Sequence, residues 1–213
     1  MKQVTKYVIK NNLKRLFTYR VCLISFKRKG FDRVFSYNLG EEASVSAEQV
    51  RKDFSEFKIK GNKKGGYQID YLLHAIDEIF KFQHNEHIIL IGMGNIGRAL
   101  VQYKRFVLRK MIIVATFDID PSKQTKRWGI PVLPLEQLDE IIHKFHVRTA
   151  IVAVPEISAQ EICDILVKSG IKGILNFAPI IPKVPVNVVV KNINLCDELQ
   201  SVIYYVDKQI MDS

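Results

Sequence analysis

The sequence predicts an α/β protein in which an N-terminal winged helix-turn-helix domain precedes a Rossmann-type domain with a doubly wound parallel sheet. Three observations lead to this prediction. The first 85 residues carry 17 Lys and Arg against 9 Asp and Glu, so this part holds +8 of the net charge of +10. The apolar run 88–91 breaks into a G-x-G-x-x-G turn. After that turn, strand-like and helix-like segments alternate, which is typical of parallel sheets.

Composition limits the classes of protein to which the chain can belong. Its 213 residues can form one large domain or two small ones, and 47% hydrophobic with 25% charged residues is ordinary for a soluble globular chain. No apolar run approaches the ~18 residues that span a bilayer, and the basic N-terminus has no continuous apolar core. We therefore expect a cytoplasmic protein without a membrane partner.

The cysteines and histidines do not predict a metal site. Cys22, Cys163 and Cys196 are far apart and none belongs to a C-x-x-C motif, which favours a reducing compartment. The two H-x-x-H pairs at 84–87 and 143–146 have no neighbouring cysteine. We therefore expect solvated histidines and no bound metal.

The basic N-terminal part has the residue spacing of a helical domain. Apolar residues recur at helical intervals over 7–26, which predicts a first helix. Ser36 is suited to cap a second, short helix. A third helix is predicted over 47–57, with Ser46 as its N-cap and Gln49 reaching back in a capping box.

The second and third predicted helices, joined by a tight turn, match a helix-turn-helix whose second member would enter the DNA major groove. Glycine-rich sequence between β-prone pieces at 58–67 predicts a hairpin wing, whose lysines suit phosphates or the minor groove. The alternative is a helical hairpin that packs on another protein, with its basic residues merely solvated. The candidate contacts to double-stranded DNA are Ser46, Gln49, Arg51, Lys52, Ser55, Lys58, Lys60, Lys63 and Lys64.

A polar joint at 83–86 separates the two predicted domains. Before it, residues 71–82 have the spacing of an amphipathic helix. We expect a DNA-binding domain over 1–83, a nucleotide-binding domain over 84–193 and a C-terminal dimerisation helix over 194–213.

The segment 88–97 predicts a buried strand, a tight turn and the start of a helix, which is the arrangement that binds a dinucleotide. Gly92 allows the sharp turn, Gly94 lets a pyrophosphate approach the backbone, and Gly97 lets the helix pack closely on the strand. The helix N-terminus then offers backbone N–H groups to the phosphates. The alternative is a glycine-rich turn in another kind of α/β protein.

A second buried strand, over 112–117, ends in Asp118, which lies 21 positions after Gly97. A carboxylate at about this spacing accepts hydrogen bonds from the ribose diol and would repel a 2′-phosphate, which favours NAD(H) over NADP(H). The alternative is a solvated strand end. Ligands of such sheets lie over the carboxyl ends of the strands, so the ends at 154–155 and 176–179 either line the crevice or form ordinary turns. The candidate cofactor-binding residues are Gly92, Met93, Gly94, Asn95, Ile96, Gly97, Asp118, Val154 and Pro155.

The rest of the chain continues the alternation. We expect strands at 130–133, 149–154, 171–177 and 186–190, and helices at 135–145 and 158–169. A last apolar-faced helix over 194–208 must dock on its own domain or on a twin subunit. We favour the twin subunit, because helix-turn-helix proteins commonly pair to meet two half-sites.

The motifs together resemble the Rex family of redox-sensing transcriptional repressors of bacteria over nearly the whole chain. The resemblance rests on the segments 45–55, 92–100, 117–120, 159–161, 173–179 and 198–205. It implies a homodimer whose last helix exchanges between subunits. It also implies that the free or NAD⁺-bound protein holds operator DNA and that NADH releases it.

Some positions depart from the family pattern. Lys63 and Lys64 stand where the family wing has Arg and Gly, and lysine keeps the charge without the bidentate geometry. In the family a switch links an Arg, a Tyr and an Asp, which align with Arg15, Tyr103 and Asn194, and asparagine cannot form the ion pair. The leading hypothesis is an NADH-responsive repressor that is not an enzyme. The alternatives are a DNA-binding paralogue with a weakened or lost response and an NAD-dependent dehydrogenase, although no domain large enough to hold a substrate follows.

Overall fold

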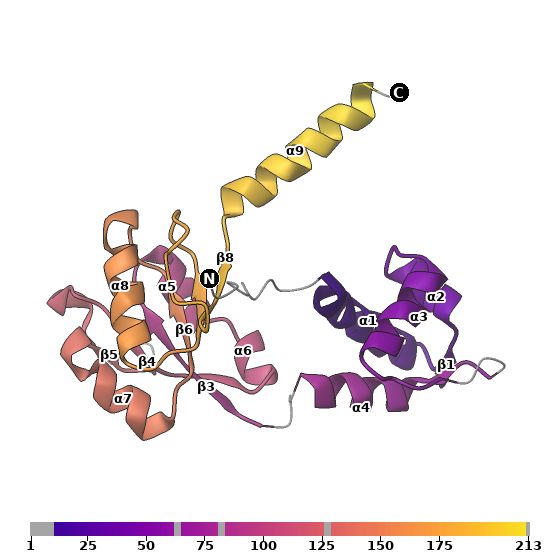
Figure 1. Ribbon diagram of the computed structural model, residues 1–213, viewed down its shortest axis with the longest axis horizontal. Coiled ribbons are helices and arrows are strands. Elements are labelled where there is room, and N and C mark those ends of the chain that lie inside the picture. Colours follow the sequence, from indigo (N-terminus) through magenta and orange to yellow (C-terminus); the bar gives the residue numbers. More distant parts are fainter. Residues whose placement is uncertain (1–10, 62–64, 81–83, 126–128, 212–213) are drawn as a thin grey trace, which may run out of the picture. The chain divides into compact units, whose positions relative to one another are not determined.

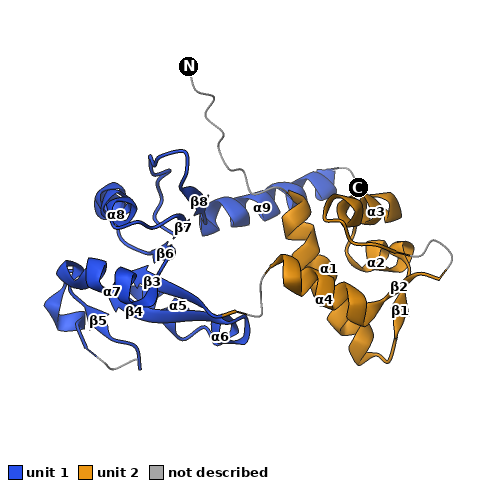
Figure 2. Ribbon diagram, turned by 60° about the horizontal axis from the view of Figure 1, so that its bottom comes forward, with its two compact units in different colours: residues 1–7, 85–213 blue, residues 8–84 orange. Residues whose placement is uncertain are grey.

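The computed structural model describes residues 11–61, 65–80, 84–125 and 129–211. The chain divides into two compact units, one within Val8–His84 and the other comprising Asn85–Ser213 (Figure 2). The division lies in the polar joint between the basic N-terminal part and the glycine motif. Within the described ranges, no helix is both long and apolar enough to cross a membrane.

The N-terminal unit is mainly helical and buries one apolar core. Its helices pack through residues that repeat at helical spacing, as the sequence predicts. Its elements are α1 (Asn11–Arg28), β1 (Arg33–Val34), α2 (Ser36–Glu42), α3 (Ala47–Glu56), β2 (Tyr67–Gln68) and α4 (Ile69–Ile79) (Figure 1). Its fully buried side chains include Leu16, Leu23, Leu39, Val50, Phe54, Leu72 and Ile76. The described helices therefore overlap the four predicted ones, and α4 begins two residues earlier than predicted.

The start of α2 differs from the prediction. Phe35 occupies the N-cap position with extended backbone, and Ser36 is the first helical residue. The Phe35 N–H donates to the Asn38 side chain at 3.4 Å, so a residue inside the helix satisfies the group that precedes it. The prediction that Ser36 caps this helix is wrong. Its hydroxyl instead accepts a hydrogen bond from Arg51 at 2.9 Å.

The described ends of the predicted hairpin wing are residues 58–61 and 65–67, and only the second end reaches a strand, β2. Residues 58–61 form no strand, and Lys58 has a positive φ of 57° that ends α3. The Ile59 N–H then donates to the Phe54 carbonyl at 2.8 Å, and the buried Ile59 side chain draws the chain back under the helix. The partner of β2 is β1, in antiparallel register. Lys63 and Lys64 lie outside the described residues.

The second unit contains a six-stranded, fully parallel sheet, which confirms the predicted Rossmann-type architecture. The strands are β3 (Glu86–Ile91), β4 (Met111–Phe117), β5 (Val132–Leu133), β6 (Thr149–Val152), β7 (Gly173–Asn176) and β8 (Val189–Asn192). Their spatial order is β5-β4-β3-β6-β7-β8. The chain thus winds outward from β3 to one edge and returns to β6, which creates a switch point between β3 and β6.

Helices cover both faces of this sheet. The remaining elements are α5 (Asn95–Val101), α6 (Arg105–Leu108), the 3₁₀ turns η1 (Pro121–Lys123) and η2 (Leu135–Gln137), α7 (Leu138–Phe145), α8 (Glu156–Lys168) and α9 (Leu195–Met211). Side chains alternate along β3, so Ile89 and Ile91 pack with α7 and α8, whereas Ile88 and Leu90 pack toward α5 and α6. The sequence did not predict α6, and the strand predicted over 149–154 ends two residues early.

The final helix, α9, has no buried residue along its 17 positions. Its exposed side chains include a stripe of Leu195, Leu199, Val202 and Val206, which recur at helical spacing. Asn194 precedes the helix, and its side chain accepts the backbone N–H of Cys196 at 3.0 Å. A helix with this much exposed apolar surface is suited to packing against another surface.

Candidate functional sites

A cavity of about 590 Å³ lies in the second unit. Its lining comes from the turn after β3, the end of β4 and the turn after β6. These are the carboxyl ends of the strands that flank the switch point, where open α/β sheets bind their ligands. Of the nine predicted cofactor-binding residues, seven line it: Gly92, Gly94, Asn95, Ile96, Asp118, Val154 and Pro155.

The other two predicted residues support the cavity from behind. Met93 is only 2% exposed and packs between the sheet and α5, while its backbone N–H donates to Asp118. Gly97 is buried in α5. A Cβ atom there would lie 1.9 Å from the Gly92 carbonyl oxygen, so glycine is required for close packing of helix and turn. The packing role predicted for Gly97 therefore has a direct geometric basis.

Gly92 and Gly94 are glycines for different reasons. Gly92 has a φ of +99°, and a Cβ atom there would lie 2.4 Å from the Ala153 carbonyl oxygen. At Gly94 a Cβ atom would meet no protein atom within 4 Å, although the residue lines the cavity. The space beside the Gly94 backbone is therefore open in the protein, as close approach by a pyrophosphate requires. This geometry fits a dinucleotide.

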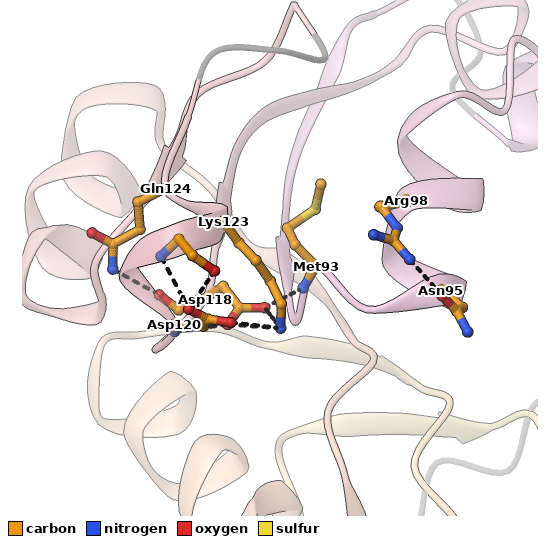
Figure 3. A network of polar contacts seen from close by, with 8 residues as sticks. Met93, Asn95, Arg98, Asp118, Asp120, Lys123 and Gln124 are labelled. Atoms are coloured by element: carbon orange, nitrogen blue, oxygen red, sulfur yellow. Dashed lines mark hydrogen bonds and ion pairs between the residues drawn. The ribbon is translucent and has the colours of Figure 1, made fainter.

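Asp118 is held at the end of β4 by backbone donors (Figure 3). It is 7% exposed, and its two carboxylate oxygens accept the N–H of Met93 at 2.7 Å and the N–H of Asp120 at 2.9 Å. The Lys123 ammonium lies 3.3 and 3.4 Å from the same two oxygens. Asp118 is thus a fixed acceptor inside the cavity rather than a solvated strand end.

Sequence reasoning missed several residues of this cavity, among them Asp120, Lys123, Leu135 and Ser158. Asp120-Pro121-Ser122 carries a local signal, because Asp120 accepts hydrogen bonds from the backbone and hydroxyl of Ser122 and so caps η1. That cap turns the chain and returns Lys123 to Asp118. Lys123 has no signal of its own in the sequence.

The end of β7, offered as an alternative lining, forms an ordinary turn. Asn176 is fully buried, and its amide donates to the carbonyls of Ala178 and Ile180 and to the side chain of Asn192. The side-chain oxygen Oδ1 of Asn176 accepts the Ala178 N–H at 3.0 Å. The Asn176 side chain is therefore committed to the loop that follows β7 and to the end of β8, and residues 176–179 do not belong to the cavity lining.

In the N-terminal unit, most of the predicted DNA contacts are exposed, on α3 and on the residues that flank it. Ser46, Arg51, Lys52, Ser55, Lys58 and Lys60 are exposed. Ser46 caps the helix as predicted, by accepting the Gln49 N–H at 3.1 Å. The reciprocal half of the predicted capping box is wrong, because the Gln49 side chain donates to Asp53 at 2.8 Å instead.

Asp53 is the centre of a buried polar network between α1 and α3. It is 1% exposed and accepts two hydrogen bonds from the Arg15 guanidinium, both at 2.6 Å. Further hydrogen bonds come from the Tyr19 hydroxyl and the Gln49 amide, each at 2.8 Å. Burial favours the neutral carboxyl, but the hydrogen bonds from Arg15, Tyr19 and Gln49 outweigh it and hold the pKa of Asp53 below its usual value. Burial, followed by the hydrogen bond to Asp53, raises the pKa of Tyr19.

The three predicted switch residues have separate local environments. Arg15 is bound to Asp53 within the N-terminal unit, and the hydrogen bond to that carboxylate raises the pKa of its guanidinium. Tyr103 follows α5, is 49% exposed and packs edge-to-face on Phe106. Asn194 caps α9. In the described part of the chain, no three His, Cys, Asp or Glu side chains gather to hold a metal ion.

Comparisons with known proteins agree with this division. Residues 10–55 match the family model described as putative DNA-binding protein N-terminus, and residues 83–180 match the one described as CoA binding domain. The first match contains α1, α2 and all but the last residue of α3. The second contains the glycine motif and Asp118.

Similarity also extends over nearly the whole chain. The redox-sensing transcriptional repressor Rex of Streptococcus agalactiae serotype Ia is 34% identical over 207 residues, which cover 96% of this chain and 99% of that protein. Solved structures of RSP match with a TM-score of 0.89 for its complex with NAD⁺ and operator DNA, at 30% identity over 97% of this chain and 96% of that one. The complex of RSP with NADH matches with a TM-score of 0.86, at 29% identity over 97% and 98% of the two chains. The chain belongs to the Rex family of redox-sensing transcriptional repressors.

Proposed function

We propose that this protein is a cytoplasmic repressor that binds operator DNA through α3 and releases it when NADH occupies the cavity of the second unit. The observation that carries the proposal is the open space beside Gly94, with Asp118 fixed at the next strand end. The relatives support it, since they are Rex repressors and the matched RSP structures contain NADH or NAD⁺ with operator DNA. In this proposal the nucleotide is a signal, and the protein is not an enzyme.

On the DNA side, α3 is the recognition helix. Arg51 and Lys52 lie exposed on it, and Arg51 is aligned by its hydrogen bond to Ser36 on α2. The exposed lysines at 58 and 60 follow the helix and would contact phosphates. Gln49 contributes less than predicted, because its amide is bonded to Asp53.

On the nucleotide side, different residues of the cavity would bind different parts of the dinucleotide. The Gly94 backbone leaves room for the pyrophosphate, and Asp118 offers carboxylate oxygens to the ribose diol. Apolar side chains such as Ile96, Leu135 and Ile162 exclude water from the rest of the cavity. NADH then acts by population shift, since it can release DNA only if it binds one arrangement of the protein better than the other.

The proposal is tested by fluorescence anisotropy of a labelled AT-rich inverted-repeat duplex, titrated with NADH and separately with NAD⁺. Release by NADH alone supports the repressor. Tight binding that ignores both nucleotides would support a paralogue without a sensor, an alternative motivated by Asn194 and by the engagement of Arg15 with Asp53. Oxidation of a stoichiometric excess of NADH with a carbonyl compound would indicate a dehydrogenase.

We expect Arg51→Ala to weaken operator binding by roughly 10- to 100-fold, as for loss of a bidentate base contact. Gln49→Ala is the matched variant from the same helix, and we expect it to stay within about threefold of the wild type because it removes only a hydrogen bond inside the protein. Fluorescence anisotropy at a fixed salt concentration measures the operator affinity of both variants. Equal losses, or a larger loss for Gln49→Ala, would contradict this assignment.

We also propose that α9 pairs the chain with a second copy. The proposal rests on an apolar stripe that lies exposed on this 17-residue helix, which has no buried residue. The stripe consists of Leu195, Leu199, Val202 and Val206. Leu199→Asp with Val202→Asp is expected to convert a dimer into a monomer and to weaken binding to the two-half-site duplex more than to a single half-site. Light scattering after gel filtration reports the mass. A dimeric double variant would exclude this helix as the interface.

A further inference from the structure

The adenosine end of the proposed nucleotide site contains a cation that the glycine motif does not predict. Lys123 lines the cavity together with Asp118 and Asp120 (Figure 3). Its ammonium lies 3.3 Å from Oδ2 and 3.4 Å from Oδ1 of Asp118, and 3.7 Å from Oδ2 of Asp120. It is the one basic side chain among the described residues of this lining. Arg98, also drawn in Figure 3, donates to Asn95 and does not line the cavity.

The contacts of Asp118 show what the lysine covers. A carboxylate has about four acceptor positions, two on each oxygen. The N–H groups of Met93 and Asp120 take one position on each oxygen of Asp118. Lys123 lies nearly equidistant from the two oxygens and so covers the edge that remains, which is the edge a ribose diol needs. When the ribose diol displaces the Lys123 ammonium from Asp118, the ammonium can still form an ion pair with Asp120.

Charge at this corner decides which nucleotide can enter. Asp118 and Asp120 carry two negative charges and Lys123 one positive charge, so the three groups sum to −1. A 2′-phosphate would add negative charge beside the carboxylates, and like charges at this range repel strongly when partly shielded from water. Without Lys123 the phosphate would meet a charge of −2, and with Asp120 neutral it would meet a charge of about zero.

We propose that Lys123 is a specificity-determining residue, which sets how strongly the nucleotide site rejects NADPH relative to NADH. Asp118 selects the ribose diol, and Lys123 limits the penalty that a 2′-phosphate meets. The site therefore binds NADH best and admits NADPH weakly at low ionic strength. This inference rests on the proposed binding of NADH in this cavity.

Isothermal titration calorimetry of the full-length protein with NADH and with NADPH, at low salt, tests the proposal. The quantity compared is the ratio of the Kd for NADPH to the Kd for NADH. We expect Lys123→Met to raise this ratio by about tenfold, a magnitude discounted for a partly exposed charge. Asp120→Asn should lower the ratio because it removes a negative charge near the 2′-phosphate. The turn should persist, because the asparagine oxygen can still cap η1. Lys123→Arg should leave it near the wild-type value.

Lys172→Met is the matched control, because it removes an exposed lysine just before β7. Lys172 lies at the amino ends of the strands, whereas the cavity lies at their carboxyl ends. The ratio for Lys172→Met should equal that of the wild type. The same change in both affinities for Lys123→Met, or no change, would show that Lys123 only supports the fold. A wild type that binds NADH but shows no binding of NADPH at low salt would also overturn the proposal. Failure to bind either nucleotide would instead refute the proposed nucleotide site itself.

Discussion

Gly94→Val is expected to abolish the release of operator DNA by NADH while leaving operator binding unchanged and the fold intact. A Cβ atom at Gly94 meets no protein atom within 4 Å, and the φ of −73° is open to any L-residue. The free energy of unfolding should therefore fall by no more than about 1 kcal/mol, the usual cost of an apolar residue at a helix N-cap such as Gly94 in α5. The isopropyl group would occupy the space that the pyrophosphate needs.

We expect the affinity of Gly94→Val for NADH to fall on the order of a hundredfold, or about 2.7 kcal/mol. Calorimetry with NADH, thermal melting and operator anisotropy measure the three quantities.

Gly97→Ala separates this effect from loss of the fold. Its Cβ would lie 1.9 Å from the Gly92 carbonyl oxygen, so the turn or α5 must shift. We expect a loss of about 2 kcal/mol or more in stability, as in other overpacked sites, together with weaker NADH binding. A Gly94→Val protein that still releases DNA at the wild-type concentration of NADH would show that the dinucleotide does not cross the Gly94 backbone.

The contrast between these glycines shows how far the sequence could predict the site. The G-x-G-x-x-G spacing predicted the turn, the close packing and the open approach, because these are local properties of a strand followed by a helix. Asp118 was predictable for the same reason, since it ends the next buried strand. Lys123 was not, because only the cap by Asp120 returns the chain to Asp118.

The fold shows the same distinction between local and tertiary signals. Alternation of apolar strands and helices predicted the parallel sheet, and the helical spacing over the N-terminal part predicted its core. The first arm of the wing, residues 58–61, was expected to be a strand because its residues are β-prone, but it forms no strand. Ile59 is drawn into the core, and β2 pairs with β1, a strand of two residues that is too short to leave a pattern. Gln49 failed similarly, since its capping spacing is correct but Asp53 competes for its amide.

Asp53→Ala is expected to destabilise the protein by roughly 3 kcal/mol, in the range found when one partner of a buried ion pair is removed. The carboxylate is 1% exposed and accepts hydrogen bonds from Arg15, Tyr19 and Gln49, so its loss leaves three donors without their acceptor. Because the hydrogen bonds from Arg15 and Tyr19 join α1 to α3, the recognition helix should also lose its fixed orientation, and binding should fall more for operator than for non-specific DNA. Urea unfolding and competition anisotropy measure the two effects.

Two comparisons distinguish this network from an ordinary ion pair. Asp70→Ala breaks the exposed pair between Lys27 and Asp70, whose side chains are 55% and 75% exposed, and should cost at most about 1 kcal/mol. The pKa of Asp53 is held low in the folded protein, so its contribution is present at neutral pH, above the value of about 3.9 expected in the unfolded chain, and is lost as the pH falls through the folded pKa. The stability difference between wild type and Asp53→Ala should therefore shrink on acidification. A difference that is constant with pH would mean that packing, and not the charged hydrogen bonds of Asp53, holds α3 in place.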